Sequence, residues 1–344
     1  MKKQKAVIVI ATYNERENIS KLLPLTLKYT SDILNWNVSI LVVDDNSPDG
    51  TQEVVKDFQK EHKSVHLLTG EKQGLGAAYR RGFSYAIDTF DPDILFEMDG
   101  DLQHDPGLIP SFLKKIDQGA DFVIGSRFIK GGSIPENWEL HRKIFSLGAN
   151  LGLCFGFMNF KVHDWTSGFR AIKADFINKT LHRYTPYDGY VFQIAVLDTA
   201  IKEGLKVAEV PLNFKDRKHG SSKIPALQYI ITIMLYVMQH SSFFKFAVVG
   251  VIGAIIDFGL SYVGIELLSW PVALSTIISA EGSVLSNFSL NNLWSFAHKR
   301  IDKSSHLLNA FLKFHVVALG SDWPTNFSDA LCYRYFWHYL LVYI

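Results

Sequence analysis

Short apolar runs alternate with helical segments over the first part of this 344-residue chain. We expect strands at Ala6–Ile10, Val38–Val43, Val65–Leu68, Ile94–Phe96 and Asp121–Gly125. The segments between them predict helices at Arg16–Thr30, Thr51 to about Lys60, Gly74–Ile87 and Leu108–Gln118. This order is typical of a doubly wound, mainly parallel α/β sheet with helices on both faces.

Polar clusters follow three of the predicted strands. They are Tyr13-Asn14-Glu15, Asp44-Asp45 and Asp99-Gly100-Asp101. Ligands of such sheets bind at the carboxyl ends of the strands, so the three clusters are expected to converge on one site.

Asp99 and Asp101 are the first candidates for chemistry. In an extended segment, residues two apart lie on one face, so both carboxylates would point at one place. Gly100 would permit close approach of a ligand, and Gln103 would add a neutral oxygen. Hard oxygen ligands favour Mg²⁺ or Mn²⁺ holding a diphosphate. A solvated acidic turn is the alternative for an isolated Asp-x-Asp, and the convergence of the three clusters favours the metal site.

Several classes of protein are disfavoured. The first strand lacks the glycine pattern of dinucleotide-binding enzymes, and no P-loop lysine follows a glycine-rich loop. A net charge of +1 gives no indication of nucleic-acid binding. Cys154 and Cys332 form no metal or redox motif, which fits a reducing compartment.

The motifs over about residues 5–225 together resemble glycosyltransferase family 2, and within it the dolichyl-phosphate mannose synthases. Those that carry the resemblance are Ala11-Thr12-Tyr13-Asn14-Glu15-Arg16-Glu17-Asn18-Ile19, Asp44-Asp45-Asn46-Ser47-Pro48-Asp49-Gly50-Thr51, Gly74-Leu75-Gly76-Ala77-Ala78, Met98-Asp99-Gly100-Asp101-Leu102-Gln103-His104, Gly125-Ser126-Arg127-Phe128, Trp138, Arg142-Lys143, Gly148-Ala149-Asn150, Asp164-Trp165-Thr166-Ser167-Gly168-Phe169-Arg170, Gly189-Tyr190-Val191-Phe192-Gln193, Glu209-Val210-Pro211, Arg217 and Gly220-Ser221-Ser222-Lys223. Ala11 stands where the family usually has proline.

The resemblance implies a GT-A fold and a metal-dependent inverting transfer of mannose from GDP-mannose to dolichyl (polyprenyl) phosphate. The product would be the lipid-linked mannose donor for glycosylation. It also implies residue roles on the donor side. The nucleotide sugar would be held by Ala11, Tyr13, Glu15, Val43, Asp45, Asp99, Gly100, Asp101, Arg217 and Lys223, and the metal by Asp99, Asp101 and Gln103.

The acceptor side is expected to need cations, because its phosphate must approach the diphosphate of the donor. Arg127 and Arg142 flank a Gly131-Gly132 loop and are the candidates, with Ser146 as a weaker one. A lipid phosphate is already ionised at pH 7, so the reaction needs no general base. Positioning and metal stabilisation of the leaving group would supply the catalysis, with Asp99, Asp101, Arg127 and Arg142 as catalytic residues.

The composition becomes apolar after Lys223. Segment 224–240 is expected to lie in the membrane interface or to pack on the catalytic domain. Phe246–Ile265 and Trp270–Leu290 have the length of membrane spans, and the cationic residues at both ends predict a cytoplasmic catalytic domain. Asp257 and Glu281 within them suggest a function that the sequence does not identify.

The region from Phe243 to about Leu319 resembles a GtrA-like four-helix membrane domain, with the start of a third helix at Leu307–Leu319. The pattern becomes polar after Gly320, and the rest of the domain looks garbled or truncated. The expected division is a GT-A domain at 1–223, an interfacial helix or linker at 224–242 and the membrane domain at 243–344.

Three alternative functions remain open. A glucosyltransferase would use UDP-glucose on the same lipid carrier. A processive polysaccharide synthase is disfavoured because the chain has no Gln-x-x-Arg-Trp motif. A non-catalytic lipid carrier would tolerate replacement of Asp101.

Overall fold

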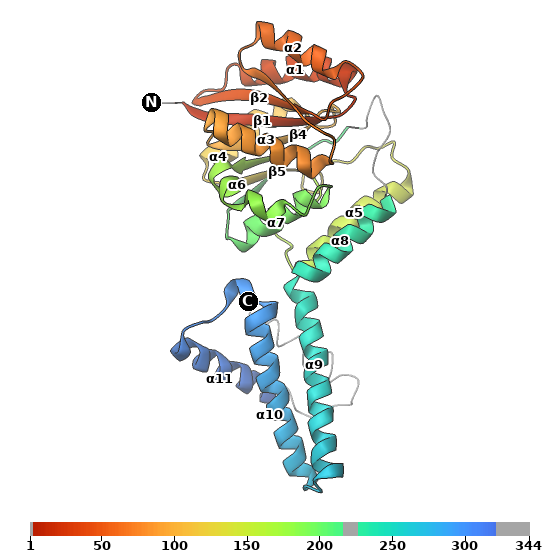
Figure 1. Cartoon of the computed structure of the whole chain (residues 1–344), viewed down its shortest axis with the longest axis vertical. Helices are drawn as coiled ribbons and strands as arrows, with labels where there is room; N and C mark the ends of the chain where they lie inside the picture. The colour runs from red at the N-terminus through yellow and green to blue at the C-terminus, as the bar shows by residue number, and fades with distance from the viewer. Residues whose placement is uncertain (1–2, 216–225, 321–344) are drawn as a thin grey trace. The chain divides into compact units, whose positions relative to one another are not determined.

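A seven-stranded sheet forms the centre of the N-terminal part of the chain in the computed structural model, which describes residues 3–215 and 226–320 (Figure 1). The strand order is β3-β2-β1-β4-β6-β5-β7, and β6 runs antiparallel to its neighbours β4 and β5. The other pairs are parallel. The strands are β1 (Gln4–Thr12), β2 (Trp36–Asp44), β3 (Val65–Thr69), β4 (Ile94–Asp99), β5 (Phe122–Ser126), β6 (Arg170–Lys173) and β7 (Val207–Pro211). The predicted mainly parallel α/β sheet is confirmed.

Helices fill the connections between the strands. They are α1 (Arg16–Thr30), α2 (Thr51–Glu61), α3 (Leu75–Phe90), the 3₁₀ turn η1 (Pro106–Leu108), α4 (Ile109–Asp117), α5 (Leu140–Gly156), α6 (Ala174–Thr180), the 3₁₀ turn η2 (Leu181–Tyr184) and α7 (Val191–Lys202). Helix α1 contacts α2 and α4, whereas α3 contacts α6 and α7, so two helical layers cover the sheet.

Alternation along the strands explains the two layers. Ile8 and Ile10 of β1 belong to one buried cluster with Leu22 of α1. Val9, the residue between them, faces the other way and approaches Gly82 of α3. Successive side chains of a strand point to opposite faces, so a run that is apolar at every position is buried on both sides.

The turn after β4 differs from the extended geometry expected for Asp99 and Asp101. The strand ends at Asp99, and Leu102 adopts a left-handed φ of 65°. The Asp101 carboxylate accepts a hydrogen bond from the backbone N–H of Gln103 at 3.1 Å. Aspartate side chains commonly close such turns, and this local bond competes with continuation of the strand.

The chain consists of two compact units, Met1–Tyr236 and Val237–Ile344. Helix α8 (Ala226–His240) crosses the division. The second unit contains α9 (Ser242–Tyr262), the π-helical turn η3 (Val263–Leu267), α10 (Val272–Leu290), the π-helical turn η4 (Asn291–Ser295), the 3₁₀ turn η5 (Ala297–Lys299) and α11 (Ser304–Gly320).

The second unit is built around the antiparallel pair α9 and α10. Small residues bring the two helices together, because a side chain at Gly253 would clash with Asn287. The Ser261 and Ser279 hydroxyls lie 2.8 Å apart across the pair. Close approach of this kind is typical of helices packed in membranes.

Among the described residues, one helical stretch, Ser242–Leu267, is long and apolar enough to cross a membrane by length and composition. The predicted second span corresponds to α10, which does not meet that criterion. Its serines, asparagine and Glu281 reduce its apolar character. Glu281 lies 3.3 Å from Nε2 of His315 on α11, so its partner within this unit is a histidine.

Candidate active site

A cavity of about 470 Å³ lies at the carboxyl ends of β1, β2 and β4. It brings together most of the residues predicted to hold the nucleotide sugar. Those that line it are Ala11, Tyr13, Glu15, Asp45, Asp99, Gly100 and Asp101. Val43 and Gln103 do not line it, and Arg217 and Lys223 lie outside the described residues.

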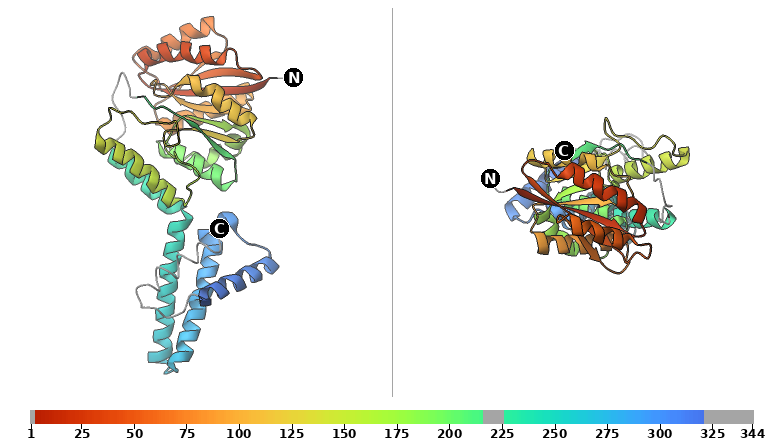
Figure 2. Two further views of the ribbon diagram at one scale, coloured as in Figure 1. Left: turned by 180° about the vertical axis from the view of Figure 1, so that it is seen from behind. Right: turned by 90° about the horizontal axis from the view of Figure 1, so that it is seen from above.

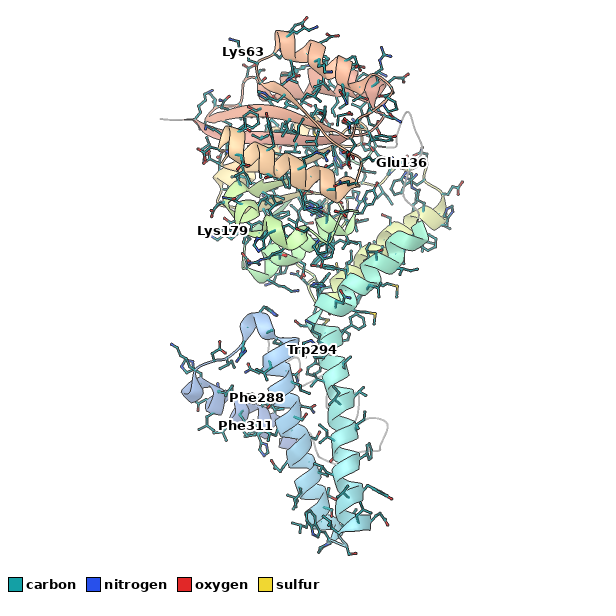
Figure 3. The ribbon with its side chains drawn as sticks, in the orientation of Figure 1. Lys63, Glu136, Lys179, Phe288, Trp294 and Phe311 are labelled. Carbon is teal, nitrogen blue, oxygen red and sulfur yellow. The ribbon has the colours of Figure 1, made fainter. Side chains whose placement is uncertain are left out.

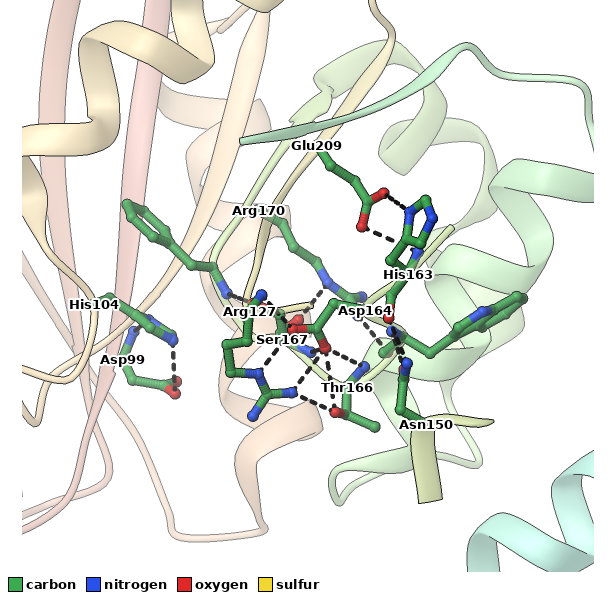
Figure 4. Close-up of polar contacts among 12 residues, drawn as sticks. Asp99, His104, Arg127, Asn150, His163, Asp164, Thr166, Ser167, Arg170 and Glu209 are labelled. Carbon is green, nitrogen blue, oxygen red and sulfur yellow. Dashed lines mark hydrogen bonds and ion pairs between the residues drawn. The ribbon is translucent and has the colours of Figure 1, made fainter. Parts of the chain in front are cut away.

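Asp99 is held by two buried side chains beneath the cavity. The Tyr79 hydroxyl donates to Oδ1 of Asp99 at 3.1 Å, and the pKa of Tyr79 is well above its ordinary value because the side chain is buried beside acidic groups. His104 accepts the backbone N–H of Asp99 at Nδ1, 3.0 Å away. Its Nε2 lies 3.8 Å from Oδ2 of Asp99 (Figure 4). The two contacts fix the orientation of the carboxylate.

Gln103, a predicted metal ligand, is not among the residues that line the cavity. Its side-chain amide donates to the carbonyl of Lys215 at 3.1 Å, and 6% of the residue is exposed. The described residues contain no cluster of three His, Cys, Asp or Glu side chains arranged to hold a metal ion. Of the three predicted metal ligands, Asp99 and Asp101 line the cavity and Gln103 does not.

Two basic side chains contact the cavity-lining residues Asp45 and Tyr13, and the sequence analysis did not identify either of them. Arg81 pairs with Asp45 at 2.6 Å, and burial nevertheless raises the pKa of Asp45 above its ordinary value. Lys72 places its ammonium 3.6 Å from the ring centre of Tyr13, a cation–π contact. Neither cation belongs to a recognised motif, so only their position in the fold reveals them.

The opposite wall is the loop Pro186–Val191, which lies more than 80 residues after the last acidic cluster in the chain. The backbone N–H of Gly76 donates to the carbonyl of Asp188 at 2.8 Å. Arg80 donates to the carbonyl of Tyr187 at 3.0 Å and pairs with the Asp188 carboxylate. The start of α3 therefore supports this wall.

Gly76 leaves no room for a side chain, because an added Cβ would collide with the carbonyl of Tyr187. We expect Gly76→Ala to displace the loop, to cost about 1–3 kcal/mol of stability and to weaken nucleotide-sugar binding. Gly152→Ala on α5 is the matched control, since nothing lies within 4 Å of its added Cβ. Thermal unfolding and donor titration of both variants would check this, and equal behaviour would contradict it.

Arg127 lies in a buried ion pair outside the lining of the cavity. Its Nε and Nη2 donate to the two oxygens of Asp164 at 2.8 and 2.7 Å (Figure 4). Nη2 also donates to the Thr166 hydroxyl at 2.6 Å. The Asp164 side chain is fully buried, and 9% of the Arg127 side chain is exposed. The geometry identifies Arg127 first as the partner that neutralises Asp164.

Arg142 and Ser146 lie on α5, away from the described lining of the cavity. Arg142 is exposed and stacks on Trp138, with its guanidinium carbon 3.8 Å from the ring centre. Apolar side chains on α5 are also exposed, among them Leu140, Ile144, Leu147, Leu151 and Phe155.

A second buried ion pair lies under the site. Both carboxylate oxygens of Glu97 lack a hydrogen-bond partner, and burial raises the pKa of Glu97 to about 7, although Arg170 opposes this shift from 3.9 Å. Arg170 is fully buried and donates to the carbonyls of Trp165, Ser167 and Gln193. It thereby joins the segment after Asp164 to α7.

Helix α8 also contributes to the cavity, through Thr232. One turn later, the Tyr236 hydroxyl donates to the buried Asp198 carboxylate at 3.0 Å, and its ring packs edge-on against Tyr187 of the loop. The opposite face of α8 exposes Ile230, Ile231, Met234, Leu235 and Met238. Packing on the catalytic domain, one of the two expectations for this segment, is therefore observed. The helix runs beside α5 (Figures 1 and 2).

We expect Tyr236→Phe to lower stability by about 1.5–3 kcal/mol, because it removes a hydrogen bond to a buried carboxylate and keeps the ring. Tyr184→Phe is the matched control: it removes a buried bond to the neutral Thr180 hydroxyl, 3.0 Å long, and should cost about 0.5–1.5 kcal/mol. Chemical denaturation would compare the stabilities of the two variants. A smaller loss of stability in Tyr236→Phe than in Tyr184→Phe would show that the bond to Asp198 does not hold α8 on the catalytic domain.

Comparisons with known proteins place this chain in a family. Residues 7–182 match the model of glycosyl transferase family 2. The chain is 32% identical to a dolichol-phosphate mannosyltransferase of Pyrococcus furiosus over 324 residues, which cover 92% of this chain and 87% of the relative. The chain belongs to glycosyl transferase family 2. Residues 245–343 match the GtrA/DPMS transmembrane domain, so this family 2 member carries a membrane domain.

Two shorter relatives match the N-terminal part of this family 2 chain. A polyprenol monophosphomannose synthase of Mycolicibacterium smegmatis is 38% identical, covering 64% of this chain and 81% of the relative. An undecaprenyl-phosphate mannosyltransferase of Micrococcus luteus is 36% identical, covering 64% of this chain and 87% of the relative.

Among solved structures, glucosyl-3-phosphoglycerate synthase from Mycobacterium tuberculosis, in complex with Mn²⁺ and UDP-glucose, superposes with a TM-score of 0.51 at 17% identity. The match covers 69% of this chain and 79% of that one. This likeness confirms the predicted GT-A fold.

Proposed function

We propose that this chain transfers mannose from GDP-mannose to dolichyl or another polyprenyl phosphate, with inversion at the anomeric carbon. The main structural support is the cavity at the ends of three strands, which is lined by Tyr13, Glu15, Asp45, Asp99 and Asp101. The three relatives described above bear the names of mannosyltransferases or mannose synthases for lipid phosphates, which supports this sugar and this acceptor.

The charge of the cavity supports a divalent cation. Its described lining includes five carboxylates, those of Glu15, Asp45, Asp99, Asp101 and Asp188. The same described lining includes a single lysine or arginine, Lys72. A diphosphate would be repelled from such a surface unless further positive charge were present. Oxygens of Asp99, Asp101 and Gln103 would suit Mg²⁺ or Mn²⁺, and that ion would stabilise the charge developing on the leaving diphosphate.

The side chains of this protein would then bind and orient the two substrates. Tyr13, Glu15 and Asp45 would hold the nucleoside, with Ala11, Val43 and Gly100 supplying backbone. Arg217 and Lys223 would bind the diphosphate. An ionised oxygen of the lipid phosphate would attack the anomeric carbon directly, so no residue has to remove a proton. Arg127, Arg142 and Ser146 would offset the repulsion between the two anions.

The membrane arrangement is also a proposal. In the division into 1–223, 224–242 and 243–344, the first part would be a cytoplasmic catalytic domain and the last part a multi-pass membrane domain. Lys245 at the start of α9 and Lys299, Arg300 and Lys303 after α10 belong to one end of this antiparallel pair, and they support this orientation. Labelling of single cysteines introduced near Lys60 and Ser269 in sealed vesicles would test it, because the two sites should react from opposite sides.

A glucosyltransferase that uses UDP-glucose is the second candidate, supported by the fold shared with a UDP-glucose-bound synthase. Transfer of radiolabelled sugar to a short polyprenyl phosphate, from GDP-mannose and from UDP-glucose in parallel, separates the two. We expect transfer from GDP-mannose alone. Preferred transfer from UDP-glucose would overturn the mannose assignment, and no transfer from either donor would favour a non-catalytic lipid carrier.

Metal removal provides a separate prediction on the same assay. EDTA should lower transfer by at least about 1,000-fold, which corresponds to about 4 kcal/mol of transition-state stabilisation. Addition of Mg²⁺ or Mn²⁺ in excess should restore it, while Ca²⁺-saturated EDTA serves as the control for non-specific effects. Full activity after chelation would exclude an essential metal.

A further inference from the structure

A second cavity, of about 950 Å³, lies within the unit Val237–Ile344. It is bounded by the end of α10, the turn η4, the segment that follows it and helix α11. Figure 3 labels Phe288 and Phe311 on the two helices beside it, and their rings meet edge-to-face at 5.2 Å.

The ionisable side chains in the described lining of this cavity are all basic. Lys299, His306 and Lys313 line it, and its described lining contains no aspartate or glutamate. Within the described ranges, none of these three side chains forms an ion pair. Other charges nearby do find partners, as Arg300 does with Asp302 at 2.7 Å. Basic groups gathered without an acidic partner favour an anion in the space between them.

A buried polar group also faces this space. Asn291 lines the cavity, 5% of the residue is exposed, and its Oδ1 has no hydrogen-bond partner. The next residue, Asn292, is fully engaged, because its amide bonds both backbone groups of Ile301 at 2.9 and 3.2 Å. Buried amides are normally satisfied, so the state of Asn291 indicates a missing polar ligand.

The rest of the lining is apolar. Leu312 and Val316, one turn apart on α11, line the cavity and are 51% and 68% exposed. Phe288 and Phe314 add aromatic surface at 5.5 Å from each other. An occupant with a charged head and an apolar tail would satisfy both parts of the cavity.

We propose that this cavity binds the phosphate headgroup of a lipid. Lys299, Lys313 and His306 contact the phosphate, Asn291 bonds a polar group of the headgroup, and the chain runs along Leu312 and Val316. The site lies in the membrane unit, and its existence does not require the transfer reaction proposed above.

Native mass spectrometry of the full chain in detergent, with farnesyl phosphate as the probe, tests this site. Wild-type protein should retain one more farnesyl phosphate than Lys299→Gln/Lys313→Gln, or bind it at least 10-fold more tightly. Asn291→Asp should weaken binding to a similar degree, because it adds a negative charge that repels the phosphate. Lys303→Gln is the matched control, since this basic residue of the same segment does not line the cavity.

Two further probes identify the chemistry. Farnesol should not compete; equal competition by farnesol would overturn a phosphate site. Displacement by an equal concentration of inorganic phosphate would support the anion site but assign it to free phosphate. Identical binding by wild type and the double variant would overturn the proposal. If the transferase assignment is wrong, wild type and the double variant both lack the farnesyl phosphate expected at the catalytic domain. The difference in lipid binding between the two proteins would still remain.

Discussion

Asp101→Ala should reduce mannosyl transfer by at least about 1,000-fold, a loss of about 4 kcal/mol in transition-state stabilisation. The carboxylate lines the donor cavity, next to Asp99, where the proposed cation would sit. Removing one of the two charged oxygen ligands would weaken the binding of the ion, and the departing diphosphate would then be poorly stabilised. Steady-state transfer with saturating Mn²⁺ measures the effect.

The matched variant is Asp101→Asn. Its side-chain oxygen can still accept the Gln103 N–H, a bond of 3.1 Å in the native turn, while the charge is lost. If charge is what matters, both variants lose activity and Asp101→Asn keeps the melting temperature of the wild type. Wild-type turnover in Asp101→Ala would reject the metal-dependent enzyme and favour a lipid-binding protein.

Arg127→Met should lower the free energy of unfolding by about 3–5 kcal/mol, because it leaves the fully buried Asp164 without its counter-charge. The same residue is proposed to act on the acceptor phosphate, so activity alone cannot separate its two roles. Denaturant unfolding can, since a residue that served only the acceptor would change stability little.

Two further variants separate the two roles of Arg127. Arg142→Met removes an exposed guanidinium stacked on Trp138 and should cost only about 0.5–1 kcal/mol of stability while it raises the KM for polyprenyl phosphate. Replacing both Arg127 and Asp164 by apolar residues should recover part of the stability lost in Arg127→Met, because no buried charge is left unpaired. Failure of the pair to recover any stability would show that Asp164 is not the reason for the loss.

The donor side of the site could be predicted because each part is local in the sequence. Tyr13, Asp45 and Asp99 follow strands that their own apolar runs specify, and parallel strands bring their carboxyl ends together. Two other residues that line the cavity had no such signal. Lys72 belongs to no motif, and Thr232 belongs to a helix that was expected either in the membrane interface or on the catalytic domain, with no residue of it assigned to the site.

The sequence by itself determined the first five strands and the four helices between them, and it placed the acidic residues Asp45, Asp99 and Asp101 at one edge of the sheet; it did not predict the antiparallel strand β6, the strand β7 or the helices α5 to α7. The period of apolar side chains and the strand-end turns are properties of short segments. Only the tertiary structure decided what Arg127 pairs with, how Asp101 turns away from the strand and that the loop at Tyr187 closes the cavity. These outcomes depend on which distant groups must share one buried space, because a charge or polar group removed from water needs a partner that local patterns do not specify.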